Sequence, residues 1–424
     1  MKPDEETKEE IDKPEIVTGD VIGDTAYSER FVLKILLKLA NLDTLKHEIP
    51  EKSFEDDLCT LWDMTTERDV VLFLQKHDVL NLINFALPIV NSPRIIEIFI
   101  GIVGNMCCQK EAVVELLKID GLMNTLLEYS KSDDSLILIQ LLRLISSCLF
   151  LSHDDDVAIW MKLFLNYGYS DALYFILSNS SNKDLLVTAL ENFNTICSYC
   201  NIEKHRKDFF IHFITEEALV SLCTAFTEVT VSQKDLLESD VLERLMVICL
   251  QIILNLTGFD KSHEIYANKR DNLTTVIHQI MNYYENKLVK QKEIDSDIVD
   301  IIESTNTIVN ILKLGEHSHP NKFFKQTYKM WEAACSMTNS DNCSDFEDDK
   351  KELLEFPEKI KGPLASLIGL YVSQCDQKYL LKVLDSIRRD YEDILKLIKD
   401  VELQSAVTKR TDNYRTRLKE NVDS

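Results

Sequence analysis

Residues 92–108 read SPRIIEIFIGIVGNMCC and contain the clearest helix start in the chain. A serine before a helix accepts hydrogen bonds from the first backbone N–H groups, and proline suits the first helical position. The residues that follow, Arg94 to Cys108, are apolar almost all round. Such a helix must be covered by neighbours on several sides, so this stretch predicts a buried helix among other helices.

The proline and glycine contents extend this prediction to the whole chain. Its 424 residues include 8 prolines and 10 glycines, and no proline lies between Pro93 and Pro320. Because proline breaks helix interiors, so long a proline-free stretch, rich in Leu and Ile, favours successive helices. The glycine-dependent phosphate-binding motifs G-x-G-x-x-G and G-x-x-x-x-G-K-[ST] do not occur. We therefore expect an all-α protein and exclude dinucleotide-binding and P-loop enzymes.

Similar apolar helices are predicted to recur over residues 135–151, 184–198, 241–257 and 298–314. Aligning their apolar patterns makes these pairs equivalent: Asn105-Met106, Ser147-Cys148, Thr195-Ile196, Asn255-Leu256 and Asn310-Ile311. The intervals are 42, 48, 60 and 55 residues. The first two fit the period of roughly 40–47 residues in armadillo or HEAT repeats, and the last two require insertions. Because one helix pair cannot bury its own apolar face, we predict an armadillo/HEAT-like right-handed helical solenoid with degenerate repeats.

Composition also predicts the boundaries of the domains. The expected order is a disordered acidic tail (1–18), a helical-repeat domain (19–335), an acidic flexible loop (336–353), C-terminal helices that complete the solenoid (354–405) and a weakly basic tail (406–424). Within these segments we expect a loop over 41–52, a helix over 364–374 that begins after Pro363, and another helix over roughly 377–403.

The charge balance limits the classes of partner. The chain has 71 acidic and 47 basic side chains and a formal net charge of −24. This balance argues against binding to nucleic acid or to an anionic membrane, since both require a basic face. The sequence opens without an apolar segment, and its apolar runs fall short of the roughly 18 residues of a membrane span. Most cysteines lie inside apolar runs, where a reduced thiol acts as a small core side chain. We therefore expect a soluble, intracellular protein with reduced thiols, and we expect it to be a monomer.

Three groups of residues resemble the serum amyloid A-like protein family, an intracellular helical-repeat family with no likeness to serum amyloid A itself. They are GDVIGDTAYS (19–28), CTLWDM followed by DVVLFLQ (59–64 and 69–75), and PRIIEI followed by GIVGNM (93–98 and 101–106). Downstream the likeness is one of helical pattern, with a C-terminal region around Tyr371 and Tyr391 similar to the family's end. The resemblance implies an armadillo-type fold, no known enzymatic activity, a nuclear location with the cytoplasm as alternative, and a link to cell proliferation. No catalytic or ligand-binding residues are established for the family, so none are transferred to this chain.

The metal-site and catalytic hypotheses are weak beside their structural alternatives. Cys197 and Cys200, with His205 close behind, form one C-x-x-C pair, but a structural zinc site needs a second pair of ligands. Cys197 also fits the buried stripe of its helix, so buried thiols are the favoured interpretation. No nucleophile elbow or H-E-x-x-H motif occurs, and the nine histidines are scattered. We therefore predict no enzyme activity, no metal and no cofactor, and keep a cryptic enzyme or metal-binding protein as an unfavoured alternative.

Two functional hypotheses concern polar side chains. Asparagines on the inner helices of armadillo proteins, which the aligned helices resemble, bind the backbone of an extended peptide; the corresponding residues are Asn105, Ser147, Thr195, Asn255 and Asn310. The alternative, which we favour, is that each of these side chains satisfies a neighbouring helix end or loop carbonyl. Ser344, which precedes an acidic run, is a candidate phosphoacceptor of an acidophilic kinase, and a plain solvated linker is its alternative.

These observations favour a protein-binding adaptor whose partners are proteins, with extended basic segments as the class that suits an acidic surface. A co-chaperone or assembly subunit that binds through its edge helices is the alternative.

Overall fold

The structure is a computed structural model that describes residues 20–199, 203–204, 206–232, 237–259, 261–294, 296–314, 320–339 and 347–422, with side chains except at 320–321, 339, 347–354 and 413–422. Every regular element in these ranges is a helix, and none is a β-strand. The all-α prediction is therefore confirmed. The predicted tail over 1–18 and the candidate phosphoacceptor Ser344 lie outside the described residues.

The chain divides inside helix α8, between Leu126 and Leu127, into two compact units. The helices of the first unit are α1 (Glu29–Ala40), α2 (Leu42–Glu48), α3 (Lys52–Met64), α4 (Arg68–Lys76), α5 (Val79–Ala86), η1 (Leu87–Ile89), α6 (Pro93–Met106), α7 (Lys110–Lys118) and α8 (Leu122–Glu128). Helix α1 packs against α2, α3 and α5, and α3 lies along α6. These contacts bury Phe54, Leu58 and Leu61 of α3 completely.

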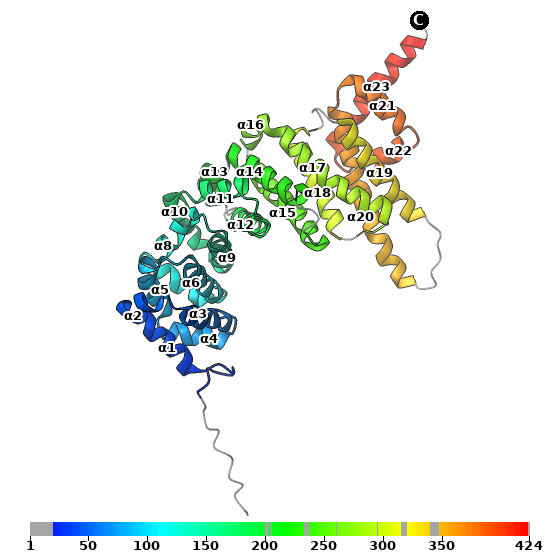
Figure 1. Ribbon diagram of the computed structural model, residues 1–424. Helices are drawn as coiled ribbons and strands as arrows, with labels where there is room; N and C mark the ends of the chain where they lie inside the picture. The colour runs from blue at the N-terminus through cyan, green and yellow to red at the C-terminus, as the bar shows by residue number, and fades with distance from the viewer. Residues whose placement is uncertain are drawn as a thin grey trace, which may run out of the picture. The chain divides into compact units, whose positions relative to one another are not determined.

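The second unit contains the remaining helices (Figure 1). They are η2 (Tyr129–Lys131), α9 (Ser135–Leu151), η3 (Asp154–Asp156), α10 (Val157–Tyr167), α11 (Tyr169–Asn179), α12 (Lys183–Tyr199), α13 (Arg206–Phe213), α14 (Glu216–Thr227), η4 (Glu228–Ser232), α15 (Ser239–Thr257), α16 (Ser262–Ile265), η6 (Ala267–Lys269), α17 (Arg270–Glu285), η7 (Asn286–Gln291), α18 (Ser296–Leu312), α19 (Pro320–Asn339), α20 (Glu347–Gln374), α21 (Gln377–Ser386), α22 (Tyr391–Leu397) and α23 (Val401–Val422).

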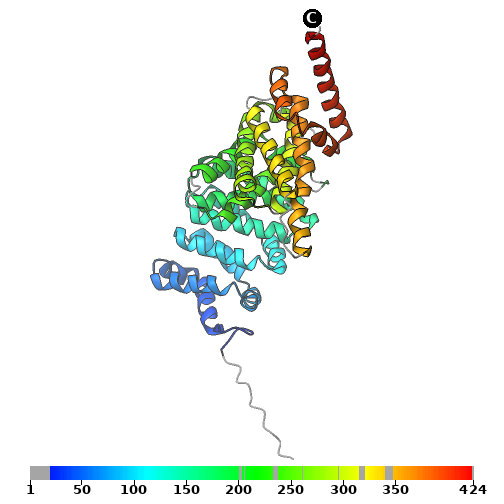
Figure 2. The ribbon, with the colours of Figure 1, turned by 90° about the vertical axis from the view of Figure 1, so that its right-hand side faces the viewer.

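The second unit is built from two parallel rows of helices (Figures 1 and 2). In one row α9, α12, α15, α18 and α20 each pack against the next; in the other, α11, α14, α17 and α19 do the same. Helices α9, α12, α15 and α18 coincide within two residues with the apolar helices predicted over 135–151, 184–198, 241–257 and 298–314. Each long helix thus buries its apolar face between its neighbours, and the predicted helical solenoid is confirmed.

The apolar helices lie in the interior of the protein. In α6 every residue from Ile95 to Val103 is buried, including Glu97. None of the described helices, taken singly, is long and apolar enough to cross a membrane. Two pairs, α4 with α5–η1 and α13 with α14–η4, reach that length only when joined across bends of 71° and 68°.

Helix starts differ from the sequence predictions at two places. Ser92 precedes α6 and Pro93 takes its first position, as predicted, but the Ser92 side chain makes no capping hydrogen bond. The predicted loop over 41–52 is wrong, because α2 occupies most of it. There the side chain of Asn41 accepts from the Thr44 N–H at 3.0 Å, and the fully buried Leu45 anchors the helix. A capping side chain and one apolar anchor thus suffice for a short helix.

The C-terminal helices also begin and end at other residues than predicted. Helix α19 continues to Asn339 and α20 begins at Glu347, so the connection between them is shorter than the segment 336–353. Helix α20 runs through Pro357 and Pro363 instead of beginning after Pro363. Its buried residues after Pro363 pack against α18, α19 and α22, and this packing outweighs the lost backbone hydrogen bonds. The helix predicted over 377–403 is divided into α21, α22 and the start of α23, and α23 continues through most of 406–424.

Candidate functional site

The row of α9, α12, α15 and α18 presents one face to solvent, which we name the ladder face. In each of α9, α12 and α15, two adjacent half-exposed residues lie between two pairs of buried residues. They are Ser146 and Ser147, Asn194 and Thr195, and Leu254 and Asn255. Other exposed or half-exposed residues of this face are Arg143, Glu191, Arg244, Gln251, Asp300, Glu303, Thr307 and Asn310. The same surface position therefore repeats from helix to helix.

The candidate peptide-binding residues of the second unit differ in their surroundings. Ser147, Thr195 and Asn255 occupy equivalent half-exposed positions, as the alignment predicts. The Thr195 hydroxyl, however, donates to the Glu191 carbonyl of its own helix at 3.0 Å. This bond within one turn is a common alternative to a contact with a ligand.

Asn310 is exposed but lies one residue out of register. In α18 the buried pair Ile308-Val309 is followed by exposed Asn310 and Ile311, whereas in α15 Leu254 and Asn255 occupy these two places. Ile311 is therefore the equivalent of Asn255 by burial. The alignment made Ile311 equivalent to Leu256, which is fully buried, but 39% of the surface of Ile311 is exposed.

Asn105 belongs to the first unit and joins two helices. Its side-chain amide donates to the Thr65 hydroxyl at 3.0 Å and lies 3.4 Å from the Trp62 carbonyl, at the C-terminal end of α3. Both partners lie at the last turn of α3, where the Trp62 carbonyl also accepts from the Thr65 N–H at 3.1 Å and from the Thr65 hydroxyl at 2.5 Å. The geometry of Asn105 is that of the helix-end alternative.

Other polar residues, which the sequence analysis missed, connect α12 with α15 across the ladder face. Asn194 donates to the Gln251 side chain at 3.0 Å, and Arg244 forms an ion pair with Glu191 at 2.9 Å. The Asn194 Oδ1 atom is buried and has no hydrogen-bond partner among the described residues. Two asparagines within five residues of an apolar helix, Asn192 and Asn194, are the sequence signal that could have indicated these contacts.

Asn192 is directed away from solvent, into the core between α9, α11 and α12. Its side-chain amide donates to the Leu142 carbonyl and to the Ser146 hydroxyl of α9, both at 3.0 Å. Its oxygen accepts from the Tyr169 hydroxyl of α11 at 2.8 Å. The fully buried Asn192 therefore joins the two rows and fixes the position of α12 under the ladder face.

The ladder face becomes acidic on α18. Asp300 and Glu303 are exposed and lie one turn apart, and Asp297 continues the stripe towards the start of the helix. Among the described residues, no lysine or arginine lies within ion-pair distance of these three carboxylates. Here the face presents unneutralised negative charge to solvent.

In the first unit, α3 and α6 meet at Trp62. The guanidinium of Arg94 lies 5.9 Å from the Trp62 ring centroid and donates to Glu97 at 2.7 Å and to the Cys59 sulfur at 3.4 Å. The hydrogen bond to Glu97 raises the pKa of Arg94. The pairing with Arg94 also compensates for the burial of the Glu97 carboxylate. All of these residues lie in the stretches that carry the family resemblance, and their contacts join the two helices.

The candidate metal ligands can be described only in part. Cys197 is fully buried, while Cys200 and His205 lie outside the described residues. In the part of the chain that the structure describes, no group of three or more His, Cys, Asp or Glu residues is placed to hold a metal ion.

Comparison with known proteins identifies relatives for part of this chain. No family model matches the sequence. Protein saal1 of Danio rerio is 32% identical over 177 residues, which are 40% of this chain and 37% of that protein. Protein SAAL1 of Homo sapiens is 30% identical over 184 residues, which are 41% of this chain and 38% of that protein. The predicted family resemblance is confirmed.

The match to the SAAL1 proteins covers less than two fifths of their length. Solved structures similar to this chain include a designed armadillo repeat protein, with a TM-score of 0.45, 12% identity and coverage of 66% of this chain and 98% of that chain. A chain from a study of the interaction between cadherin and β-catenin has a TM-score of 0.45, 10% identity and coverage of 91% and 71%. The helical solenoid itself is established by the helix packing described above.

Proposed function

We propose that this chain is a non-enzymatic adaptor that binds partner proteins along the ladder face. The observation that carries the proposal is the recurrence of equivalent half-exposed positions on α9, α12 and α15. An extended surface with a repeated spacing suits an extended ligand, because successive segments of that ligand meet similar surroundings. The contacts of Asn194 with Gln251 and of Glu191 with Arg244 hold α12 and α15 in place, so this surface is preorganised.

The partner segments are extended and basic in this proposal. Asp297, Asp300 and Glu303 lie along one exposed stripe of α18 without a described cation nearby, and the whole chain carries a net charge of −24. Opposite charge on a partner accelerates its encounter with this face and selects against acidic competitors.

The family resemblance supports a cellular role, which we propose as regulation of cell proliferation in the nucleus. Imaging of the full chain fused to a fluorescent protein tests the location directly. Nuclear fluorescence is the expected result, and exclusion from the nucleus would contradict this part of the proposal.

Reversal of charge on α18 tests the binding surface. The variant Asp300→Lys/Glu303→Lys replaces two exposed carboxylates and raises the net charge by four, without touching the core. In an affinity pull-down with mass spectrometry from the protein's own cells, partners with basic segments are expected to be lost. Circular dichroism and thermal melting first establish that the variant is folded.

The matched control is Asp385→Lys/Glu402→Lys, which makes the same change of charge at exposed positions outside the ladder face. This control is expected to retain the partners that the α18 variant loses. If both variants retain the same partners, the ladder face is not the binding surface; if both lose them, only the total charge matters.

A further inference from the structure

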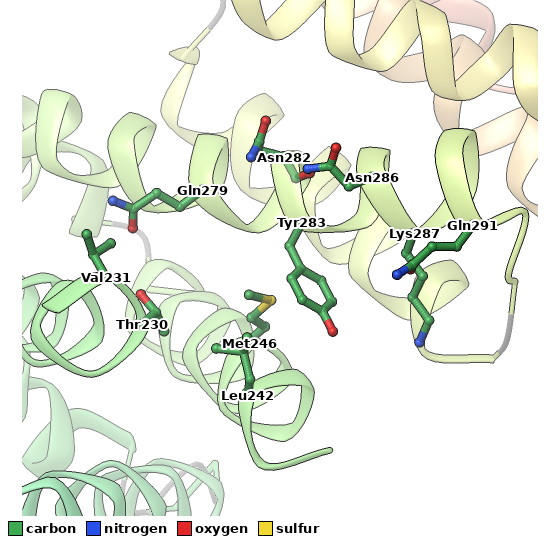
Figure 3. Close-up of a pocket in the computed structure, with 10 residues that line it drawn as sticks. All are labelled: Thr230, Val231, Leu242, Met246, Gln279, Asn282, Tyr283, Asn286, Lys287 and Gln291. Carbon is green, nitrogen blue, oxygen red and sulfur yellow. The ribbon is translucent and has the colours of Figure 1, made fainter. Parts of the chain in front are cut away.

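A groove lies beside α17 (Figure 3). One wall is formed by α17 and the segment η7 that continues it, and the other by η4 and α15. The cavity has a volume of about 450 Å³. We name it the α17 groove; its lining residues used below are Val231, Leu242, Met246, Gln279, Asn282, Tyr283, Asn286, Lys287 and Gln291.

Both π-helical segments of the described chain border this one groove. The segment η4 (Glu228–Ser232) contributes Val231, and η7 (Asn286–Gln291) contributes Asn286, Lys287 and Gln291. A π-helix widens the turn relative to an α-helix, is rare, and is found often at functional sites. The convergence of both segments on one cavity gives this cavity walls that regular α-helices alone would not form.

One wall of the groove is lined with side-chain amides. Gln279, Asn282 and Asn286 follow one another along α17 and into η7, and Gln291 follows at the end of that segment (Figure 3). Two of these groups already hold one bond each: the Asn286 amide donates to the Asn282 carbonyl at 2.7 Å, and the Asn282 side-chain oxygen accepts from the Gln326 amide of α19 at 3.3 Å. A carboxamide offers donors and an acceptor, as a peptide bond does, so the Asn282 amide N–H groups and the Asn286 side-chain oxygen are the groups left to pair with a ligand. The Gln279 Oε1 atom is buried and has no hydrogen-bond partner among the described residues. Leaving such an acceptor unpaired costs stability, so a turn of the Gln279 side chain that brings it to a ligand N–H would be favourable.

The spacing of the amides fits an extended chain. The seven residues from Gln279 to Asn286 correspond to about 10 Å along a helix. An extended peptide covers that distance with about three residues. One peptide segment can therefore meet successive side-chain amides.

The one charged lining residue described, Lys287, is already neutralised. Its ammonium group lies 3.0 Å and 2.9 Å from the two carboxylate oxygens of Glu243. The Tyr283 hydroxyl donates to the same carboxylate at 2.7 Å. The Lys287–Glu243 pair therefore presents no net charge to a ligand in the groove. Leu242 and Met246 form an apolar floor, and Val231, 56% exposed, lies at the rim.

We propose that the α17 groove binds an extended, uncharged peptide segment of a partner protein. The ligand backbone pairs with the amides of Gln279, Asn282 and Asn286, and an aliphatic ligand side chain lies against Leu242, Met246 and Val231. The amide wall of this site belongs to the other helix row, and the site prefers uncharged segments, which distinguishes it from the acidic ladder face.

The test begins with a random dodecapeptide library displayed on phage and selected against the full chain. Synthetic peptides of the enriched sequences are then titrated calorimetrically into the wild type and into Gln279→Leu/Asn286→Leu. We expect enriched peptides with an uncharged aliphatic core, and an affinity loss of at least about tenfold in the variant, since two amide hydrogen bonds are removed.

Two further variants separate binding from folding and from the ladder face. In Gln279→Leu alone the melting temperature is expected not to fall, because the replaced oxygen has no partner, while peptide affinity still falls. The variant Gln251→Leu/Asn255→Leu changes the same two residue types on the ladder face and is expected to alter the affinity less than twofold. The proposal would be overturned if peptide affinity fell only in Gln251→Leu/Asn255→Leu, or in neither double variant. A library that yields no enriched binders would also overturn it.

Discussion

Gly101 shows how one missing side chain positions another residue. A glycine inside a helix admits the close approach of a neighbour, and the group that approaches Gly101 is the indole ring of Trp62. A Cβ atom at position 101 would lie 2.2–2.6 Å from three atoms of that ring. Because the ring is itself held beside Arg94, it has little room to move.

Replacement of Gly101 by alanine is therefore expected to destabilise the protein by about 1–3 kcal/mol, the usual cost of overpacking a core. Urea denaturation followed by circular dichroism measures the change. Gly362→Ala is the contrasting variant: apart from its chain neighbours, its Cβ would meet only the Leu397 carbonyl, at 3.7 Å, so no overpacking is expected. The helical gain of alanine is offset there by its clash with the ring of Pro363, so the free energy of unfolding is expected to change by less than about 1 kcal/mol. Equal effects at both positions would contradict the packing argument.

The buried cysteines predict how stability responds to alkaline pH. Burial raises the pKa of the Cys223 thiol to about 12 from 9.0, and it also raises the pKa of Cys249. A folded state that binds a proton more tightly than the unfolded state loses stability as pH rises above the unfolded pKa. We therefore expect the free energy of unfolding to fall from about pH 9 towards pH 12. Denaturation midpoints of the wild type and Cys223→Ala across this range test it, with a shallower fall expected in the variant.

At the scale of helices, the Asn192 side chain forms hydrogen bonds that join α12 to α9 and to α11. The variant Asn192→Leu leaves the Tyr169 hydroxyl without its partner and removes two bonds to α9. Because buried polar groups are left unsatisfied, the free energy of unfolding is expected to fall by about 2–4 kcal/mol. In a double-mutant cycle with Tyr169→Phe, the double variant is expected to be less destabilised than the sum of the single variants, since neither buried partner then remains unpaired. Strict additivity would show that the two side chains act separately.

At the scale of the whole molecule, the excess of acidic side chains opposes compaction. A net charge of −24 causes self-repulsion, which salt screens. Raising NaCl from about 20 mM to about 200 mM shortens the screening length to below about 10 Å and is expected to raise the melting temperature by a few degrees. Scanning calorimetry measures this shift. The charge-raising variant Asp385→Lys/Glu402→Lys is expected to gain less from salt, and an equal gain would point to a specific ion effect.

The helical class, the solenoid and the positions of its long helices follow from local properties of the chain. Apolar periodicity and the absence of proline act within one helix, so α9, α12, α15 and α18 could be placed within two residues. The contacts between helices could not be placed in this way. The burial of Asn192, the exposure of Asn310, the indole beside Gly101 and the helix through Pro363 all depend on which neighbour packs alongside. The α17 groove has the same origin, because its two walls come from segments about fifty residues apart that meet only when the rows stack.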